Sequence, residues 1–393
     1  MQKPRGWGSP PIQDWTAALE RETVPFLLGD PMQSYRVIVW GTGFVGRGVL
    51  RNLITHPAYN VVGVLVNDPA KEGRDIGALV DLPEVGLVAS RDAEDVLSRP
   101  ADAVCYFGPS ALHMETNLAN LTSALRAGKN VIETTIGALQ NPGRAPAVIR
   151  DVIEKACRDG GTTYFSAGID PGFGNDLLPL TLLGLCGRVD RVHTTEFLDA
   201  GTYPDQASLA SMGLCSSLAD TPLLDTPGMM TSIWGGPLYM IAEAIGAEVS
   251  ETIEHYERWA APSAIDFAMG RVEAGHAAAH RIRLAGLVDG EERIVIDHVH
   301  RVVPDVAPDW PRPASDPAHA NRVEITGIPN LVQETVFADE FTGDGNAGGC
   351  LATGMRGGNA IPAVVAAAPG ILSTLDLPLI PGCGGMGHAK ALP

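Results

Sequence analysis

Three short segments of the chain combine glycine and acidic residues in patterns that suit hydride and proton transfer. Residues 41–46 (GTGFVG) have the G-x-G-x-x-G spacing of a turn that cradles a dinucleotide pyrophosphate. Glu133 ends an apolar run, and Asp170 lies in the turn at residues 168–176 (GIDPGFGND). A carboxylate beside a nicotinamide can serve as a general acid or base while the cofactor carries the hydride. These patterns favour an oxidoreductase.

The glycine turn has the sequence context that a dinucleotide site requires. It follows a β-branched apolar run at residues 36–40 and opens a helical pattern that stops at His56-Pro57. The N-terminus of such a helix offers unpaired N–H groups and the positive end of its dipole to phosphates. An ordinary glycine-rich turn without a ligand is the alternative. We expect the cofactor contacts to come from Gly41, Thr42, Gly43, Phe44, Val45 and Gly46.

The end of the next predicted strand, residues 60–66, bears on the choice between NAD and NADP. An acid that binds the ribose of NAD typically ends this strand, but here Asn67 comes first and Asp68 follows it. Lys71 and Arg74 stand nearby and can receive a 2′-phosphate, unless they are only solvated loop charges. We predict NADP as the cofactor, with NAD as the alternative.

Two further turns follow predicted parallel strands and should gather at the carboxyl edge of the sheet. The turn after residues 103–107 either lines the nicotinamide ribose or is a plain strand-to-helix turn; its candidates are Phe107, Gly108 and Pro109. Glu133 ends the strand at residues 130–134, where burial would raise its pKa toward a proton-transfer role. The alternative for Glu133 is a carboxylate that faces water.

The turn at residues 168–176 supplies the second catalytic candidate, Asp170. Helix N-capping is the alternative role for Asp170 and for Asp176, because an apolar helical stretch begins directly after them. Substrate contacts are expected from Thr134, Phe173 and Asn175.

These residues need a scaffold, and the pattern along the chain predicts one. Strands alternate with helical patterns up to residue 166, which predicts an α/β Rossmann domain with a doubly wound parallel sheet. Strand-like segments then follow at 190–198, 251–260, 277–288, 293–303 and 321–326, with a helix at 238–245 and a loop at 304–320. They predict a second, α+β domain with a mostly antiparallel sheet. We divide the chain into an N-terminal extension (1–34), the dinucleotide-binding domain (35–166), a substrate domain (167–345) and a C-terminal helix and tail that returns to the first domain (346–393).

Histidines give a weaker signal. His276 and His280 are four residues apart and could share a helix face, and His298 and His300 face one side of a strand. Because no third ligand lies near them in the sequence, we interpret all four as solvated surface residues and predict no metal.

Composition excludes other classes of function. With 28 Lys and Arg against 46 Asp and Glu, the net charge of −18 repels nucleic-acid phosphates and anionic lipid, so we expect no nucleic-acid or membrane partner. No apolar run is long enough to span a bilayer, and the first 31 residues lack the core of a signal peptide. The six cysteines form no C-x-x-C pair, which is typical of reduced thiols in a cytoplasmic protein.

Taken together, these motifs resemble the dihydrodipicolinate-reductase-like superfamily. More narrowly, they resemble the branch that contains 2,4-diaminopentanoate dehydrogenase and the native amine dehydrogenases. The similarity spans about residues 35–385 and rests on GTGFVG (41–46), NDPAKEGRDIGAL (67–79), GKNVIETT (128–135), AGIDPGFGNDLLP (167–179) and ATGMRGGNAIPAV (352–364). The last two are the more specific.

The resemblance implies a homodimer, with the second domain forming both the substrate site and the dimer contact. It also implies reversible reductive amination of a small ketone or aldehyde with ammonia to a primary amine. Glu133 would then bind ammonium and transfer its proton, and Asp170 would hold the amine or orient Glu133. The alternatives are a C=O or C=C reductase of the same superfamily and a non-catalytic nicotinamide-binding protein.

The chain departs from its relatives in three places. It lacks the paired-histidine and lysine signature of true dihydrodipicolinate reductases, which disfavours a role in lysine biosynthesis. Residues 134–137 read TTIG where relatives read something like CEE, and Asp170 stands where relatives commonly have asparagine.

Overall fold

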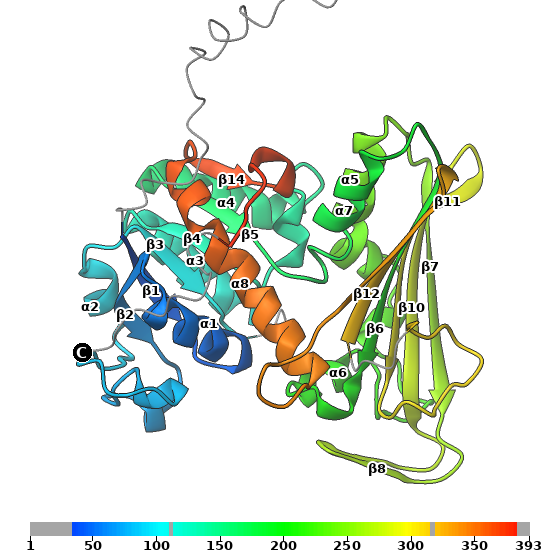
Figure 1. Cartoon of the computed structure of the whole chain (residues 1–393), viewed down its shortest axis with the longest axis horizontal. Helices are drawn as coiled ribbons and strands as arrows, with labels where there is room; N and C mark the ends of the chain where they lie inside the picture. The colour runs from blue at the N-terminus through cyan, green and yellow to red at the C-terminus, as the bar shows by residue number, and fades with distance from the viewer. Residues whose placement is uncertain (1–33, 110–112, 315–318, 383–393) are drawn as a thin grey trace, which may run out of the picture.

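The first of two large sheets carries the glycine turn. The computed structural model describes residues 34–109, 113–314 and 319–382, so the predicted N-terminal extension lies outside it apart from Ser34. All six strands of this sheet are parallel, in the order β14-β5-β4-β3-β1-β2 (Figure 1). Their bounds are β1 Tyr35–Trp40, β2 Tyr59–Leu65, β3 Ala103–Tyr106, β4 Asn130–Glu133, β5 Thr163–Ser166 and β14 Gly370–Leu372.

Helices cover both faces of this sheet. Successive residues of its strands point to opposite faces, and because both sets are apolar, both faces are buried. Val39 and Ile132 face α1 (Phe44–Thr55) and α8 (Gly345–Ala366). On the other face, side chains such as Val131 pack against helices of the opposite layer, namely α2 (Ala93–Ser98), α3 (Met114–Arg126) and α4 (Ala147–Gly160). The predicted Rossmann fold is therefore confirmed.

Helix α8 crosses back over the first sheet although it comes late in the chain (Figure 1). Its glycines permit this close contact. A Cβ atom at Gly354 would lie 2.3 Å from Val49 of α1, and one at Gly357 would lie 2.8 Å from Ile132 of β4. The small-residue composition that marked this helix in the sequence is thus what lets its backbone approach the sheet and α1.

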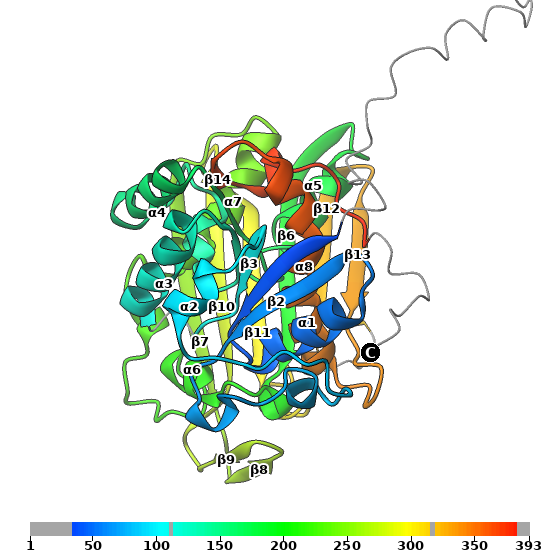
Figure 2. The same ribbon diagram turned by 90° about the vertical axis from the view of Figure 1, so that its left-hand side faces the viewer.

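The second sheet has the strand order β13-β12-β6-β11-β10-β7 and is antiparallel except for the pair β6 and β11 (Figure 2). The mostly antiparallel sheet predicted here is confirmed. Its strands are β6 Arg188–Asp199, β7 Glu251–Ala260, β10 Ala277–Val288, β11 Glu291–Arg301, β12 His319–Ile328 and β13 Leu331–Val336. A small hairpin of β8 (Ile265–Phe267) and β9 (Gly270–Val272) extends from it.

The inner face of the second sheet packs against α7 (Met229–Ala244), which lies between the two sheets together with α5 (Leu177–Leu183) (Figure 1). Helix α6 (Gln206–Ser211) lies near one end of the sheet. Helix α7 begins at Met229, well before the predicted start at residue 238. Gly235-Gly236-Pro237 masked the helical pattern, but burial of the whole segment keeps it helical.

Four short strands were not predicted from the sequence: the hairpin strands β8 and β9 and the edge strands β13 and β14. β14 has only three residues, too few for a periodic pattern, and β13 carries mixed polar and apolar residues on a sheet edge. Within the described residues, no helix is long and apolar enough to cross a membrane.

Candidate active site

The glycine turn after β1 has the shape of a dinucleotide cradle. Gly41 has a φ of +101°, and a Cβ there would lie 2.0 Å from the carbonyl oxygen of Phe107. A Cβ at Gly46 would lie 2.0 Å from the Gly41 carbonyl oxygen, so both positions require glycine. Gly43 faces open space, and no side chain caps the N-terminus of α1 behind it. The exposed N–H groups of this helix end therefore fit a pyrophosphate.

Lys71 lies directly against this turn. Its Nζ donates to the Thr42 carbonyl oxygen at 2.8 Å and approaches Thr42 Oγ1 at 3.3 Å. Asp68 turns away to cap a short 3-10 helix, where its Oδ1 accepts from Ala70 N at 2.9 Å. Asn67 and Arg74 are exposed on the same loop. Of the charged residues on this loop, the one in contact with the glycine turn is thus a cation, Lys71.

The turn after β3 lies beside the glycine turn, because Phe107 N donates to Trp40 O at 2.7 Å at the end of β1. Asn117 of α3 holds the next residues in place by donating to the Pro109 carbonyl oxygen at 3.1 Å. Gly108 has no room for a side chain, since its Cβ would lie 2.2 Å from the Tyr106 hydroxyl. The structure therefore brings this turn to the cradle, where it was expected.

Glu133 is fully buried, and both oxygens of its carboxylate accept hydrogen bonds from neighbouring residues. Tyr164 donates its hydroxyl to Oε1 at 2.7 Å. Oε2 accepts from Ile136 N at 3.0 Å, from Thr135 Oγ1 at 2.7 Å and from Thr135 N. Burial and the charge of Glu133 raise the pKa of Tyr164 well above its usual value. Catalysis by Glu133 stays a prediction, and this geometry favours a positioning role for it in the turn after β4.

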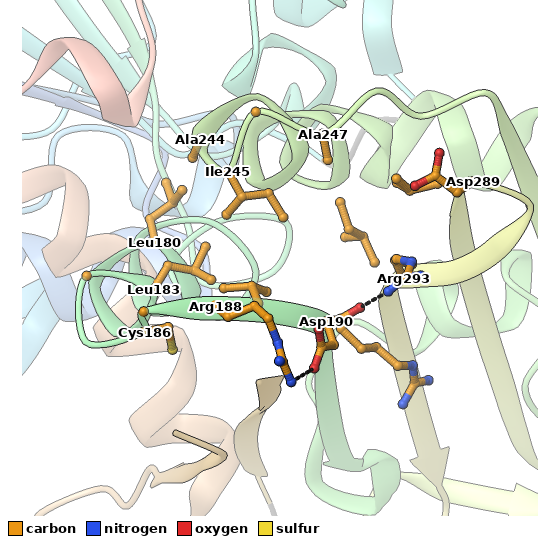
Figure 3. Close-up of a pocket in the computed structure, with 17 residues that line it drawn as sticks. Leu180, Leu183, Cys186, Arg188, Asp190, Ala244, Ile245, Ala247, Asp289 and Arg293 are labelled. Atoms are coloured by element: carbon orange, nitrogen blue, oxygen red, sulfur yellow. Dashed lines mark hydrogen bonds and ion pairs between the residues drawn. The ribbon is translucent and has the colours of Figure 1, made fainter. Parts of the chain in front are cut away.

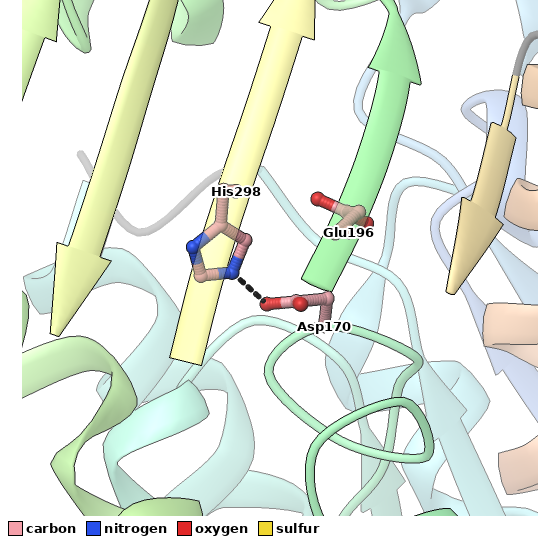
Figure 4. A group of neighbouring side chains, drawn as sticks. All are labelled: Asp170, Glu196 and His298. Atoms are coloured by element: carbon pink, nitrogen blue, oxygen red, sulfur yellow. Dashed lines mark hydrogen bonds and ion pairs between the residues drawn. The ribbon is translucent and has the colours of Figure 1, made fainter. Parts of the chain in front are cut away.

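Asp170 lies where three elements meet (Figure 4). It is on the loop after β5, and its Oδ1 accepts from Trp234 Nε1 of α7 at 2.6 Å and from His298 Nε2 of β11 at 2.9 Å. No hydrogen bond among the described residues reaches Oδ2, and 5% of the side chain is exposed. No hydrogen bond joins Asp170 to Glu133 either. The two predicted catalytic carboxylates thus have separate surroundings.

The loop that carries Asp170 is held firmly from behind. Arg356 of α8 donates to Gly168 O at 2.7 Å and to Asp176 Oδ2 at 2.9 Å. Asp176 also caps α5 through Leu177 N, so the capping alternative applies to Asp176 and not to Asp170. Asn175 is buried, and its Oδ1 accepts from Gly172 N at 2.8 Å, which shapes the loop.

Two of the three predicted substrate contacts leave part of the side chain accessible. Thr134 and Phe173 are half-buried in the turns after β4 and β5 respectively, near Glu133 and Asp170 in the chain. Asn175 is almost completely enclosed, which favours loop shaping over direct contact with substrate.

The interpretation of the histidines as surface residues was wrong. His280, His298 and His300 are buried on the inner face of the second sheet, because their side of each strand is covered by α7 and the Asp170 loop. Of the four, only His276 is half-buried, and it forms an isolated bridge with Ser217 just before β10 rather than sharing a helix face with His280. Periodicity showed that His298 and His300 share a face but could not show that this face is covered.

Glu196 of β6 was not predicted, although it organises these histidines. His300 Nε2 donates to Glu196 Oε2 at 3.0 Å, and His319 Nε2 donates to Glu196 Oε1 at 3.0 Å. His280 Nε2 and His300 Nδ1 are 2.8 Å apart and share a further hydrogen bond. An isolated glutamate in a strand carries no local signal, because its partners come from β11 and β12, far along the chain.

The charges of this cluster follow from its geometry. Burial by itself would lower the pKa of His298, but the charge and hydrogen bond of Asp170, with Glu196 and Asp297, outweigh it and raise the pKa to about 9. Burial opposes ionisation of Glu196, yet hydrogen bonds from His300 and His319 hold its pKa well below its usual value. At neutral pH the site therefore holds an imidazolium beside the Glu196 carboxylate.

The ligand atoms of Asp170, Glu196 and His298 all lie within 4.8 Å of one another, a spacing that a metal ion could bridge (Figure 4). Nε2 of His298 is already engaged with Oδ1 of Asp170 at 2.9 Å, however. We therefore interpret the three residues as a buried ion-pair cluster.

A large hollow of about 850 Å³ lies elsewhere, between the ends of α5 and α7 and the start of β6 (Figure 3). Its lining includes Leu183, Arg188, Ile245 and Arg293, and none of the predicted site residues. We do not assign this hollow as the active site, because the dinucleotide cradle lies at the first sheet.

A glycine cradle on a parallel sheet, with buried carboxylates at its carboxyl edge, defines a Rossmann-type oxidoreductase. The chain belongs to the family of amine dehydrogenases and 2,4-diaminopentanoate dehydrogenases. Residues 176–390 match the family model described as the 2,4-diaminopentanoate dehydrogenase C-terminal domain. The predicted resemblance to this branch is thus confirmed, and membership implies a nicotinamide cofactor.

Individual relatives agree with this assignment. The chain is 37% identical to an amine dehydrogenase of Streptomyces virginiae, over 90% of this chain and 99% of that protein. It is 23% identical to the 2,4-diaminopentanoate dehydrogenase of Acetoanaerobium sticklandii, over 88% and 94% of the two chains. The solved structure of an amine dehydrogenase from Mycobacterium smegmatis has the same fold, with a TM-score of 0.69 at 19% identity, over 88% of this chain and 97% of that one.

Proposed function

We propose that this chain catalyses the reversible, NADP-dependent reductive amination of a small ketone or aldehyde with ammonia to a primary amine. Its relatives named amine dehydrogenase and 2,4-diaminopentanoate dehydrogenase support the reaction class. The observation that carries the proposal is the Asp170 carboxylate. One of its oxygens is fixed by Trp234 and His298, and the other has no partner among the described residues.

Asp170 is suited to hold an ammonium ion or a protonated amine. His298 holds its Oδ1, which leaves Oδ2 to accept a hydrogen bond from an N–H donor. Its loop follows β5 and therefore lies at the edge of the sheet where a Rossmann cofactor places its reactive ring. When bound, the nicotinamide supplies or accepts the hydride.

The apolar wall behind Asp170 favours the imine over its hydrolysis. Trp234 is buried, and its ring lies 4.4 Å from that of His298. Around it, α7 packs Leu238 and Ile241 against the second sheet. Exclusion of water from this side lowers the chance that a bound imine is hydrolysed before reduction.

Lys71 supports the choice of NADP. Its ammonium group lies at the glycine turn, and Asp68, the residue best placed to bind the ribose of NAD, is engaged as a helix cap. A 2′-phosphate there would gain a charge-assisted contact that NAD lacks.

A ketone panel assayed with ammonium and with either NADPH or NADH tests the reaction. We expect ammonium-dependent NADPH oxidation that falls at least about 100-fold in Asp170→Asn while NADPH binding, followed by fluorescence, stays unchanged. Asp266→Asn, on the exposed β8 strand, is the matched control. Turnover with ketone but without ammonium would instead indicate a carbonyl reductase, and tight NADPH binding without turnover on any panel would indicate a non-catalytic protein.

We also propose that the protein is a cytoplasmic homodimer. Val332 and Val336 lie exposed on the same side of the edge strand β13, as expected of a face that a second copy covers. The five described cysteines are free thiols, which are typical of a reducing compartment. Light scattering should give twice the chain mass, and Val332→Asp should shift it toward the monomer; a wild-type monomer would contradict the proposal.

A further inference from the structure

We propose that Glu196 is the proton-transfer carboxylate of this site, in the role that the sequence suggested for Glu133, and that His300 and His280 form a relay behind it. The inference rests on the proposed function and adds to it the group that moves the proton. It is carried by the position of Glu196, by its hydrogen bonds and by the unpartnered polar atoms beside it.

Glu196 lies on the same face as the other charged residues of the site. In the parallel register of β6 and β11 it stands opposite His298, whose Nε2 donates to Asp170. Figure 4 shows Glu196 and His298 on neighbouring strands above the Asp170 loop, and an atom of each residue lies within 4.8 Å of the other two. A nitrogen bound at Asp170 would thus lie within one hydrogen bond, or one water, of Glu196.

The two glutamates differ in how many acceptor positions remain. The Glu196 carboxylate receives two hydrogen bonds, one at each oxygen from His300 or His319, whereas the Glu133 carboxylate receives four, three at Oε2 and one at Oε1. The Glu196 side chain is 11% exposed, and Glu133 is completely enclosed. A carboxylate with lone pairs to spare and an open side can meet a substrate; one that is saturated and closed cannot.

Polar atoms beside Glu196 lack partners within the described part of the chain. Thr194 precedes it by two residues on the same face, and Asn321 stands opposite it in the register of β6 and β12. Both residues are more than nine-tenths buried, and neither Thr194 Oγ1 nor Asn321 Oδ1 has a hydrogen bond. Buried polar groups are nearly always satisfied by protein, water or ligand, so these two atoms indicate a polar ligand next to Glu196.

The histidines behind Glu196 can pass a proton along existing bonds. Since Glu196 is ionised, it only accepts, so His300 must donate through Nε2. The bond between His300 Nδ1 and His280 Nε2 holds one proton. Burial lowers the pKa of His280 well below its usual value and keeps that ring neutral. Once His280 Nδ1, which has no partner among the described residues, takes up a proton from water or a ligand, Nε2 can pass its proton to His300, and His300 Nε2 can pass one to Glu196.

The chemistry balances with Glu196 as the only acid and base that contacts the substrate. Glu196 takes a proton from the ammonium held at Asp170, and the ammonia lone pair forms a C–N bond as the carbonyl π pair moves to oxygen. One proton then shifts from nitrogen to that oxygen, which gives a carbinolamine. The protonated Glu196 returns its proton to the hydroxyl group, the C–O bond breaks, and water leaves an iminium ion. The carboxylate is thereby restored.

The first test is Glu196→Gln, with Glu324→Gln as the matched control on the outer side of the same sheet. Ammonium-dependent turnover should fall about 100- to 10,000-fold. Reduction of a preformed cyclic imine that the wild type accepts should change less than about threefold, since it needs neither ammonia deprotonation nor loss of water. Equal losses on both substrates, or full ammonium-dependent turnover, would overturn the proposal.

A second variant keeps the proposal testable if Glu196→Gln does not fold. His280→Gln leaves Glu196 and its two direct donors in place but interrupts the relay. It should lower the ammonium-dependent rate and raise the solvent deuterium isotope effect on that rate; an unchanged rate and isotope effect would remove the relay. If the wild type shows no ammonium-dependent activity, the proposed function itself fails, whatever these variants do.

Discussion

His298 donates to Asp170 at 2.9 Å and thereby joins the second sheet to the loop that follows β5 of the first sheet. The two residues are 128 positions apart in the chain, and both side chains are at least 95% buried. Their ion pair therefore depends on how the domains meet. A site built at such a junction closes only when both domains are folded and correctly placed.

This ion pair should make stability depend on pH. The titratable groups around His298 come from the β5 loop, β6, β10 and β11 itself: Asp170, Glu196, His280, Asp297 and His300. The folded-state pKa of His298, about 9, lies above its ordinary 6.5, so its contribution is complete below pH 6.5 and is lost as pH rises through 9. The loss is at most about 3 kcal/mol.

Thermal unfolding between pH 6 and 10 measures this effect. We expect the Tm of the wild type to fall across the range, and the Tm of His298→Gln to start lower and vary less. His255→Gln, on the exposed side of β7, is the control and should follow the wild type. Parallel curves for wild type and His298→Gln would contradict the prediction.

Trp234→Phe should separate the hydrogen bond of the indole from its packing. Phenylalanine keeps an aromatic ring against His298, whose ring centroid lies 4.4 Å from that of Trp234, but loses the donor to Asp170. A hydrogen bond to a charged group contributes about 1.5–3 kcal/mol, so kcat/KM for the amine should fall about 10- to 100-fold. The steady-state kinetics of Trp234→Phe are compared with those of the control variant Trp259→Phe. Equal kinetics for the two variants would contradict the prediction.

Glu133→Gln distinguishes a positioning role from catalysis. If Glu133 holds the turn after β4, the variant loses charge-assisted hydrogen bonds and should unfold about 1.5–3 kcal/mol more easily. Tyr164→Phe should destabilise the protein as well, and the two changes should be non-additive because they share one bond. Denaturant unfolding of the two single variants and the double variant tests this. Unchanged stability with abolished turnover would restore Glu133 as the catalytic group.

Lys71→Ala should shift the cofactor preference. Removing the ammonium group from the glycine turn should weaken NADPH binding about tenfold, or ~1.4 kcal/mol, and leave NADH binding nearly unchanged. Fluorescence titration with both cofactors gives the two Kd values. Lys155→Ala, on the solvent side of α4, is the control. Equal losses for NADPH and NADH would place Lys71 away from the 2′-phosphate.

Features set by neighbouring residues could be predicted well. The G-x-G-x-x-G turn and the strand before it are a matter of local spacing, and the structure shows why Gly41 and Gly46 allow nothing larger. Most strands of both sheets followed from alternation and β-branched runs, but the edge strands β13 and β14 did not. Prediction failed at α7, where Gly235-Gly236-Pro237 suggests a break that burial overrides.

Tertiary structure alone decided which polar residues face one another. Glu133 lies two residues after Val131 and therefore points to the same side of β4, into the buried helix layer. The sequence shows only an acid at the end of a strand. His298, Glu196 and Asp170 come from three distant segments, and no local pattern links them. Spacing along a chain determines the side of a strand on which a residue lies, but whether that side meets water or another domain depends on long-range packing.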